Sequence, residues 1–307
     1  MIQFLLRRLL LAVPVVIGAS VMAFAIMQVL PGDPAQIMLA GTGATSADIA
    51  RLHHELGLDQ PIYEQYLSWL WRAIHGDFGR SIQQGTLIAP EIAQNAPSTL
   101  SLAAAAMVIA VGTGLILGTL AATYQHSWVD GLAMFLGTVG TAIPNFWSAM
   151  LLILVFAIWL GWFPSVGQGD LQHLVLPATA LGLDYAAVNT RLVRSGMISV
   201  LQEDYIRTAR AKGLSHLRVV LNHALKNALI PVITIAGVQF GNLMGGAVVI
   251  EIVFARQGLG RMLLGAIEGK DYPTVQGVVL FIAVVYVIVN LGVDLSYGLL
   301  DPRIRRR

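Results

Sequence analysis

The sequence predicts an all-α, polytopic membrane protein with six transmembrane helices, and three observations lead to this fold class. Hydrophobic residues make up 56% of the 307 residues and charged residues only 12%, whereas soluble domains carry about 25% charged residues. The mean hydropathy is +0.71. Six apolar segments reach the roughly 20 residues that a helix needs to cross a membrane: about 9–30, 99–123, 132–160, 174–194, 228–252 and 274–299.

The first apolar segment is expected to be a retained span. It follows Arg7 and Arg8, as the apolar part of a signal peptide would. Its apolar run is too long for a signal peptide, and the "VLPGDP" after it offers no small-x-small cleavage site. We expect a single transmembrane domain over residues 1–307. Glycines and prolines within the spans are typical of close packing and kinks in lipid: Gly112, Gly114, Gly118, Pro144, Pro177, Gly237 and Gly241.

The long loop at 31–97 is predicted to contain two helices. "TSADIARLHHELG" predicts a capped helix that ends at Gly57, and "DQPIYEQYLSWLWRAIHG" predicts a second helix that ends at Gly76. The second helix is amphipathic, because Glu64, Ser68 and Arg72 line the face opposite an apolar one. It packs on its own bundle, lies on the membrane or meets an external partner. The apolar face comprises Tyr63, Tyr66, Leu67, Leu70, Trp71 and Ile74.

The distribution of cations predicts that both termini lie in the cytoplasm. Six spans place the termini and the 195–227 loop on one side of the membrane, and loops rich in Lys and Arg stay cytoplasmic. The 31–97 loop is then extracytoplasmic. The expected cytoplasmic side holds 13 of the 19 Lys and Arg residues: Arg7, Arg8, seven from Arg191 to Lys226, and Arg303, Arg305, Arg306 and Arg307.

The 195–227 loop is predicted to form a helix, a glycine turn and a second helix. "LQEDYIRTARAKG" has acids at its start and bases later, so both sets of charges complement the helix dipole. Gly213 suits a left-handed C-terminal cap. Two interpretations remain open: an anchor on anionic lipid headgroups, or a docking surface for a cytoplasmic partner. Small residues favour docking, because they leave a slim surface that fits a groove: Ala209, Ala211 and Gly213.

Four polar residues lie within the predicted spans or at their ends, where burial is costly: Asp184, Glu251, Asn290 and Asp294. Asn290 and Asp294 are four residues apart and share a helix face. Such residues line a polar translocation path, relay protons or form interhelical polar contacts. We favour interhelical contacts for Asp294 and consider Asp184 the candidate for a path.

Several kinds of chemistry are absent from the sequence. There is no cysteine, which excludes disulfides, thiolate metal sites and a cysteine nucleophile. No G-x-x-x-x-G-K-[ST] phosphate loop occurs, and the seven histidines lack metal-ligand spacing. We therefore expect no catalytic site, no metal site and no cofactor bound by this chain. A net charge of +2 gives no reason to expect nucleic acid as a partner.

Ordered stretches along nearly the whole chain carry a family resemblance. The basic loop contains "DYIRTARAKGLS" at 204–215, followed by "HALKNALIP". This segment resembles the cytoplasmic coupling loop of ATP-binding-cassette importer permeases, in particular the first permease subunit of the dipeptide/oligopeptide family. Further stretches are similar to the same subunit, and so many in order are highly specific: "LPGDP", "LGLDQPIYEQY", "HGDFGRSI", "GLGR", "DYPTVQG" and "NLGVDLSYGLLDPRI".

The resemblance implies a coupling helix that docks into a cleft of a separate ATPase. Arg207, Thr208 and Ala209 fill the Glu-Ala-Ala positions of the general importer motif, and Gly213 is its glycine. The implied docking set is Asp204, Tyr205, Arg207, Thr208, Ala209, Arg210, Ala211, Lys212, Gly213, Leu214 and Ser215.

Three departures from the family pattern stand out. Arg207 replaces the glutamate of the general motif, and Pro231 comes later than in sugar-type permeases. Both features are usual in the peptide branch. In the predicted outer loop, Arg256 and Gln257 stand where that branch often has Trp-Pro, so the resemblance assigns this loop no role toward an external partner.

By this resemblance, the chain forms half of an importer's pathway in the bacterial cytoplasmic membrane. The implied partners are a second related permease in a heterodimer, two cytoplasmic ATPases that bind ATP and Mg, an extracytoplasmic substrate-binding protein and membrane lipid. The family carries dipeptides, longer peptides, glutathione, nickel chelates and other small solutes, and we favour peptides. The alternative is an ion-coupled secondary carrier with Asp184 or Asp294 as its proton site, a class that usually shows paired repeats or broken helices.

Overall fold

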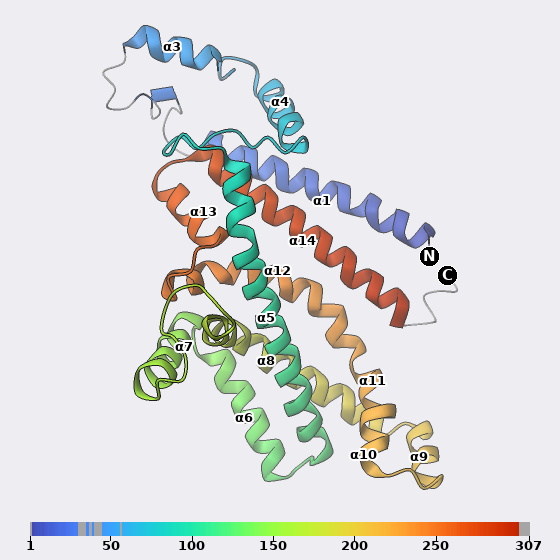
Figure 1. The fold of residues 1–307 in the computed structure, drawn as a ribbon. Helices are drawn as coiled ribbons and strands as arrows, with labels where there is room; N and C mark the ends of the chain where they lie inside the picture. Colours follow the sequence, from blue (N-terminus) through green and yellow to red (C-terminus); the bar gives the residue numbers. More distant parts are fainter. Residues whose placement is uncertain (1, 30–34, 37–38, 40–44, 56, 301–307) are drawn as a thin grey trace. The chain divides into compact units, whose positions relative to one another are not determined.

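The protein is described by a computed structural model over residues 2–29, 35–36, 39, 45–55 and 57–300. Of a few helical residues near these gaps, Asp294 among them, only the backbone is described. The "LPGDP" stretch and the four C-terminal arginines lie outside the described residues. The helices are α1 (Ile2–Val29), α3 (Ser46–Glu55), α4 (Ile62–Ile74), α5 (Ile88–Thr123), α6 (Trp128–Ala142), α7 (Asn145–Leu152), α8 (Gln172–Leu201), α9 (Asp204–Ala211), α10 (His216–Arg218), α11 (Leu225–Ala228), α12 (Ile230–Val253), α13 (Leu259–Glu268) and α14 (Tyr272–Leu300), with π-helical stretches η1 (Ile153–Trp159) and η2 (Val219–Ala224) (Figure 1).

The chain divides into two compact units. Unit 1 comprises Met1–Pro97 and Gly258–Leu291, and unit 2 comprises Ser98–Gln257 and Gly292–Arg307. Of the three divisions, one falls inside α5, at the proline in its first third, one falls between α12 and α13, and one falls inside α14. The single domain expected over residues 1–307 stays a prediction.

In unit 1, α4 and α14 pack against the C-terminal half of α1. The shared core holds Ala23, Phe24, Trp69, Ala73 and Leu280. A second joint lies at the start of α14, where the buried carboxylate of Asp271 accepts hydrogen bonds from three groups. These donors are Ser81 Oγ at 2.5 Å, Ile82 N at 3.0 Å and Thr274 Oγ1 at 2.8 Å. Two of the stretches that carry the family resemblance, "HGDFGRSI" and "DYPTVQG", are therefore joined.

In unit 2, α8 is the central helix. It packs against α6, α7, α11 and α12, and 12 of its 30 residues are buried. At the crossing of α5 and α8, a Cβ atom at Gly114 would lie 2.4 Å from the Asn189 Cβ, and one at Gly118 would lie 2.6 Å from the Val193 Cβ. These distances are too short for side chains, so the two glycines allow the helices to touch.

Four of the predicted spans coincide with helices that are long and apolar enough to cross a membrane. These helical segments are Arg8–Ile26, Ile88–Thr123, Ile230–Val253 and Tyr272–Val293, and they correspond to the spans predicted at 9–30, 99–123, 228–252 and 274–299. The described residues therefore support a multi-pass membrane protein.

The predicted span at 132–160 is wrong as one continuous helix. It consists of Trp128–Ala142 and Asn145–Trp159, which are bent by 110°. Pro144 lies at the bend, and Ile143 before it is extended, with φ −95° and ψ 123°. A proline disfavours helical backbone at the residue before it, so the chain breaks there. The bent pair is a fifth crossing only if both of its helices form one span.

The predicted span at 174–194 lies within α8, which has 30 residues but is not among the helices apolar enough to count as a span. A helix with neighbours on several sides exposes little surface to lipid and can carry more polar residues. The predicted total of six spans is not confirmed by the described part of the chain.

Both predicted helices of the 31–97 loop are present as α3 and α4. Thr45 and Asp48 cap α3 reciprocally, with Thr45 N donating to Asp48 Oδ2 at 2.9 Å and Asp48 N donating to Thr45 Oγ1 at 3.4 Å. Gly57 and Gly76 follow the two helices with φ of +67° and +82°. The apolar face predicted for α4 is only partly buried.

Candidate functional site

The basic loop folds as the short helix α9 followed by a tight turn. Glu203 before α9 is extended, and the helix begins with Asp204. Gly213 after its end has φ +77°, a left-handed conformation that strains any residue with a side chain. The chain then continues through α10, η2 and α11 into α12. The predicted order of helix, glycine turn and helix is confirmed.

The inner face of α9 is embedded in the core of unit 2. Ile206 is fully buried and Ala209, one turn later, is buried beside it. Leu214 packs against the same core from the turn. The core residues around them come from α5, α8, η2, α11 and α12: Ala122, Val193, Met197, Val219, Val220, Ala224, Ala228 and Val232. α9 therefore shares one core with these five elements, and its most extensive contacts are with η2.

One expectation for α9 needs correction. Ala209 does not contribute to a slim exposed surface, because its side chain lies in the core. Ile206 was not part of the expected docking set, yet it is the largest apolar anchor of the helix. Its spacing of three from Ala209, on a helix otherwise polar apart from Tyr205 and Ala211, was the signal that could have identified it.

Tyr205 adds polar contacts between α9 and the segment that follows it. Asn227 Nδ2 donates to the Tyr205 hydroxyl at 2.6 Å, and that hydroxyl donates to the His223 carbonyl at 3.5 Å. Tyr205 is exposed and also connects α9 to the following segment through these hydrogen bonds.

The outer face of α9 is exposed and polar, with one acidic and one basic side chain. At about 100° per residue, Asp204, Arg207, Thr208 and Ala211 fall opposite the buried face, and all four are exposed. Arg207 and Asp204 form a solvent-exposed ion pair at 3.5 Å, which contributes little to stability. Thr208 and Ala211 have short side chains, so they project little from this face. The remaining residues of the expected docking set, Arg210, Lys212, Gly213 and Ser215, are exposed as well.

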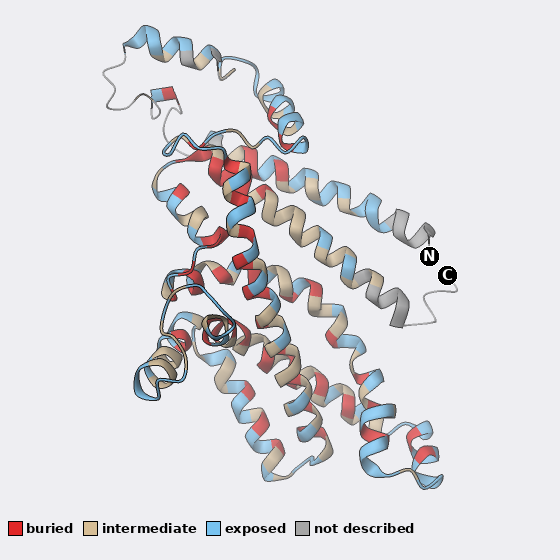
Figure 2. Cartoon of the chain, viewed as in Figure 1, coloured by how far each residue is buried: buried red, intermediate tan, exposed pale blue. Residues whose placement is uncertain are grey.

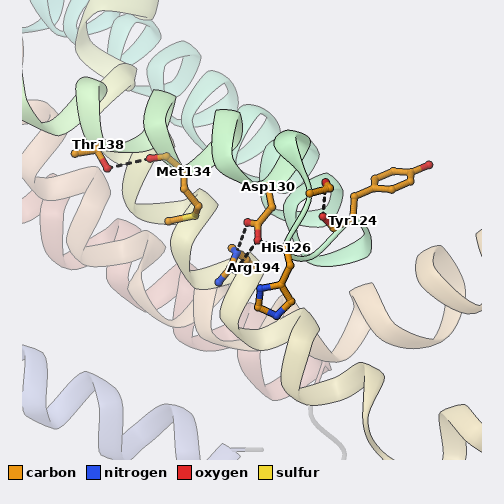
Figure 3. Close-up of polar contacts among 7 residues, drawn as sticks. Tyr124, His126, Asp130, Met134, Thr138 and Arg194 are labelled. Atoms are coloured by element: carbon orange, nitrogen blue, oxygen red, sulfur yellow. Dashed lines mark hydrogen bonds and ion pairs between the residues drawn. The ribbon is translucent and has the colours of Figure 1, made fainter.

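An ion pair braces α8, the helix that leads into α9. Arg194 Nε and Nη2 donate to the two carboxylate oxygens of Asp130 at 2.6 and 2.8 Å (Figure 3). The backbone N–H of His126 donates to the same carboxylate at 3.0 Å. Asp130 is buried near the start of α6, so the pair fixes the turn between α5 and α6 to α8. Sequence reasoning missed it, because the two residues are 64 positions apart.

Polar side chains line the contacts that α8 makes with α7 and α12. Asp184 on α8 lies close to the side chain of Asn145, which follows the bend at the start of α7. One helical turn later, Asn189 and Gln239 exchange two hydrogen bonds between their side-chain amides, at 3.0 and 3.3 Å, and both residues are buried. Asp184 therefore lies beside an interhelical polar contact, and its expected role in a path stays a prediction.

A second buried polar cluster surrounds the end of α12. Glu251 is fully buried and accepts a hydrogen bond from Thr99 Oγ1 on α5 at 2.5 Å. Arg256 is buried nearby and donates to the His173 carbonyl at 3.2 Å and to Ser98 Oγ at 3.4 Å. Burial lowers the pKa of the Arg256 guanidinium, and the Glu251 carboxylate opposes that shift. The departure at Arg256 therefore supplies a joint between α5, α8 and α12.

The pair expected from Asn290 and Asp294 remains open. Asn290 Nδ2 donates to the Tyr286 carbonyl of its own helix at 2.9 Å. The side chain of Asp294 lies outside the described residues. The interhelical role favoured for Asp294 therefore stays a prediction.

Comparison with known protein families identifies the family to which this chain belongs. Residues 114–306 match the family described as "Binding-protein-dependent transport system inner membrane component", and residues 1–103 match the N-terminal region "Binding-prot-dependent transport system membrane comp, N-term". The chain belongs to this family. It is a multi-pass permease subunit of an ATP-driven importer in the bacterial inner membrane, and it is not an enzyme.

Relatives of the permease match it along its whole length. A putative peptide transport system permease protein of Brucella abortus (strain 2308) is 43% identical over 313 residues, which cover 99% of each chain. The glutathione transport system permease protein GsiC of Escherichia coli (strain K12) is 43% identical over 305 residues, again 99% of each. The resemblance to the peptide branch is confirmed.

A solved structure shares the fold of the permease. It is an inward facing conformation of the MetNI methionine ABC transporter, with a TM-score of 0.59 and 16% sequence identity, and the match covers 69% of this chain and 96% of that chain. At this identity the likeness concerns the fold alone, and it supports the predicted all-α fold class.

Proposed function

We propose that this permease pairs with a second, related permease and that α9 is the surface on which a cytoplasmic ATPase docks. The observation that carries the proposal is the two-sided nature of α9. Its inner face, Ile206 and Ala209, is fixed in the core, while its outer face is exposed, polar and lined by small residues, with the exposed bases Arg210 and Lys212 beside it. A lipid anchor has no need of small residues such as Thr208 and Ala211 at the centre of its outer face.

In this account, α9 is a lever. Two ATPases bind ATP and Mg and close on each other, and the closure displaces the α9 helix seated in each cleft. Ile206 and the Tyr205–Asn227 hydrogen bond transmit the displacement to α8 and α12, because packed side chains do not compress. The two helices then tilt and exchange inward for outward access. The ion pair of Asp130 and Arg194 carries α6 along with α8.

The proposed substrate class is a dipeptide, an oligopeptide or a related small solute such as glutathione. Support comes from the names of the relatives, which are a peptide and a glutathione permease. A substrate-binding protein on the extracytoplasmic side delivers the solute. Asp184 is the proposed polar contact along the path, since it lies on α8 beside Asn145 at the helix bend.

The docking proposal is tested by mild-detergent purification from native membranes, with identification of the chains that co-purify. Ala211→Trp places a bulky ring on the outer face of α9 without touching the core. Gln125→Trp is the matched control, because Gln125 is also exposed, in the turn between α5 and α6. We expect loss of the ATPases alone from Ala211→Trp and retention of all partners with Gln125→Trp. Retention of the ATPases by Ala211→Trp would refute docking through α9.

The path proposal has a separate test. Asp184→Asn keeps the size and a hydrogen-bonding side chain but removes the charge. With the complex still assembled, we expect slower uptake of a labelled dipeptide or of glutathione in reconstituted vesicles. Unchanged uptake would remove Asp184 from the path and leave it as an interhelical contact.

A further inference from the structure

The apolar surface of α4 has two adjoining halves with different surroundings. At about 100° per residue, Tyr66, Trp69, Leu70 and Ala73 form one half, and Trp69 and Ala73 are each only 8% exposed. The other half, which we call the open half, is exposed. Its exposed fractions are 64% at Tyr63, 59% at Leu67, 67% at Trp71 and 70% at Ile74.

The buried half fixes the level of α4 along the first span. Trp69 and Tyr66 pack on Phe24, with ring centroids 5.9 and 5.5 Å apart, and Tyr66 Oη shares a hydrogen bond of 2.8 Å with Ser20 Oγ. Ser20 is six residues before the end of the span segment Arg8–Ile26. At 1.5 Å per residue, α4 therefore packs against the last 9 Å or so of that span, about the depth at which interfacial helices are buried.

The open half continues an apolar surface instead of interrupting a polar one. Val21 and Met22, next to the contact with α4 on α1, are exposed, as expected of residues that face lipid. The third side of α4 is polar and carries Glu64, Ser68 and Arg72. In Figure 2, α4 is pale blue over much of its surface, with its buried residues confined to one part.

We propose that α4 lies in the membrane interface at the C-terminal end of α1, with Tyr63, Leu67, Trp71 and Ile74 in contact with lipid. Tyr and Trp are the residues enriched at this level of a bilayer. Four exposed apolar side chains on one helix side would be unfavourable in water, and their level beside α1 places them next to acyl chains and headgroups. Lipid therefore explains both their composition and their depth.

This placement has a consequence for the loop that follows α4. Gly76 follows the end of α4, and Ser81 and Ile82 further along the loop are tied to the start of α14 through Asp271. A lipid-seated α4 and the Asp271 joint then hold the 76–87 loop from both ends. The loop is kept at the membrane surface and cannot swing freely into the water.

The test uses the absence of cysteine in the chain, which allows single nitroxide labels without a background change. Leu67→Cys and Ile74→Cys report the open half, and Ser68→Cys, one residue from Leu67 on the polar side, is the matched control. Each variant is purified with its partner subunits and reconstituted in vesicles of phosphatidylethanolamine and phosphatidylglycerol. Relaxation of the label by oxygen, which concentrates in lipid, is compared with relaxation by a water-soluble nickel chelate.

We expect oxygen to relax the labels at Leu67→Cys and Ile74→Cys several-fold more strongly than the nickel chelate, and the order to reverse at Ser68→Cys. Strong nickel relaxation at both reporter positions would mean that the open half faces water. Weak relaxation by both reagents would mean that another protein chain covers it. Either of these results would overturn the proposal.

Discussion

Gly118 lets α5 approach α8 more closely than a side chain would allow. A Cβ atom at this position would lie 2.6 Å from the Val193 Cβ and 2.7 Å from the Thr190 carbonyl oxygen. Neither neighbour is the flexible end of a side chain, so an added methyl group forces the helices apart. Gly112, on the same helix, has no atom within 4 Å of such a Cβ among the described residues.

These two glycines make a matched pair for mutation. We expect Gly118→Ala to destabilise the permease by about 1–3 kcal/mol through overpacking. Gly112→Ala should leave stability unchanged or slightly raised, because alanine favours helix more than glycine does. Thermal unfolding of the two variants in the same detergent measures the difference. Equal melting temperatures would show that the crossing of α5 and α8 is looser than described.

The reciprocal amide pair of Asn189 and Gln239 should behave as one unit. Either single change to alanine leaves the other amide buried without its partner, at a cost of about 1–3 kcal/mol. The double variant should cost less than the sum of the two single changes, because no amide is then stranded. A double-mutant cycle on thermal stability measures this coupling. Strict additivity would contradict the pair's role as a joint between α8 and α12.

At the scale of the element, α9 combines a firm attachment with an accessible surface. Its attachment depends mainly on Ile206, whose side chain is fully buried, and on the hydrogen bond between Tyr205 and Asn227. Its accessible surface depends on residues that make no contact with the core. Changes to the two sides should therefore have separable effects.

Ile206→Ala should loosen α9 without altering its outer face. We expect a loss of stability of about 2–5 kcal/mol, the usual cost of such a cavity, with the ATPases still bound. ATP hydrolysis would continue while uptake per ATP falls, because the lever is no longer rigid. Leu217→Ala is the control, since Leu217 is 68% exposed in the same loop. Intact coupling in Ile206→Ala would mean that force passes elsewhere.

The elements also show where sequence patterns reach their limit. Capping residues, apolar periodicity and charge placement predicted α3, α4, α9 and the Gly213 turn, because these features depend on nearby residues. The pattern did not reveal that α4 divides its apolar surface between Phe24 and the outside, nor that Ala209 faces inward. Both depend on neighbours far away in the chain. Pro144 predicts a kink, but the presence of a proline does not predict a bend of 110°.

At the scale of the whole molecule, composition and motif order were sufficient for the class of protein. An apolar chain with few charges must lie in a membrane, and the ordered motifs pointed to the peptide branch, in agreement with the family match. The joints within the units were not predictable: the ion pair of Asp130 and Arg194, and the contacts of Asp271. Each joins residues that are far apart in the chain, and local sequence periodicity does not predict such a contact.

Orientation is a further prediction at this scale. The cation distribution places α9 in the cytoplasm and the loop after α4 outside. A cysteine introduced at exposed Gln84 should react with a membrane-impermeant maleimide in right-side-out vesicles, and Ala211→Cys only in inverted ones. The opposite pattern would reverse the topology and exclude cytoplasmic docking by α9.

The central claim is that a separate ATPase grips the outer face of α9, and site-directed crosslinking tests it most directly. Thr208→Cys and Ala211→Cys each provide the only cysteine of the chain, and Gln125→Cys is the control on the same expected side. With a short bifunctional crosslinker in inverted vesicles, the account predicts adducts between the permease and an ATPase chain at the first two positions only. Adducts at Gln125→Cys with none at either α9 position would contradict it.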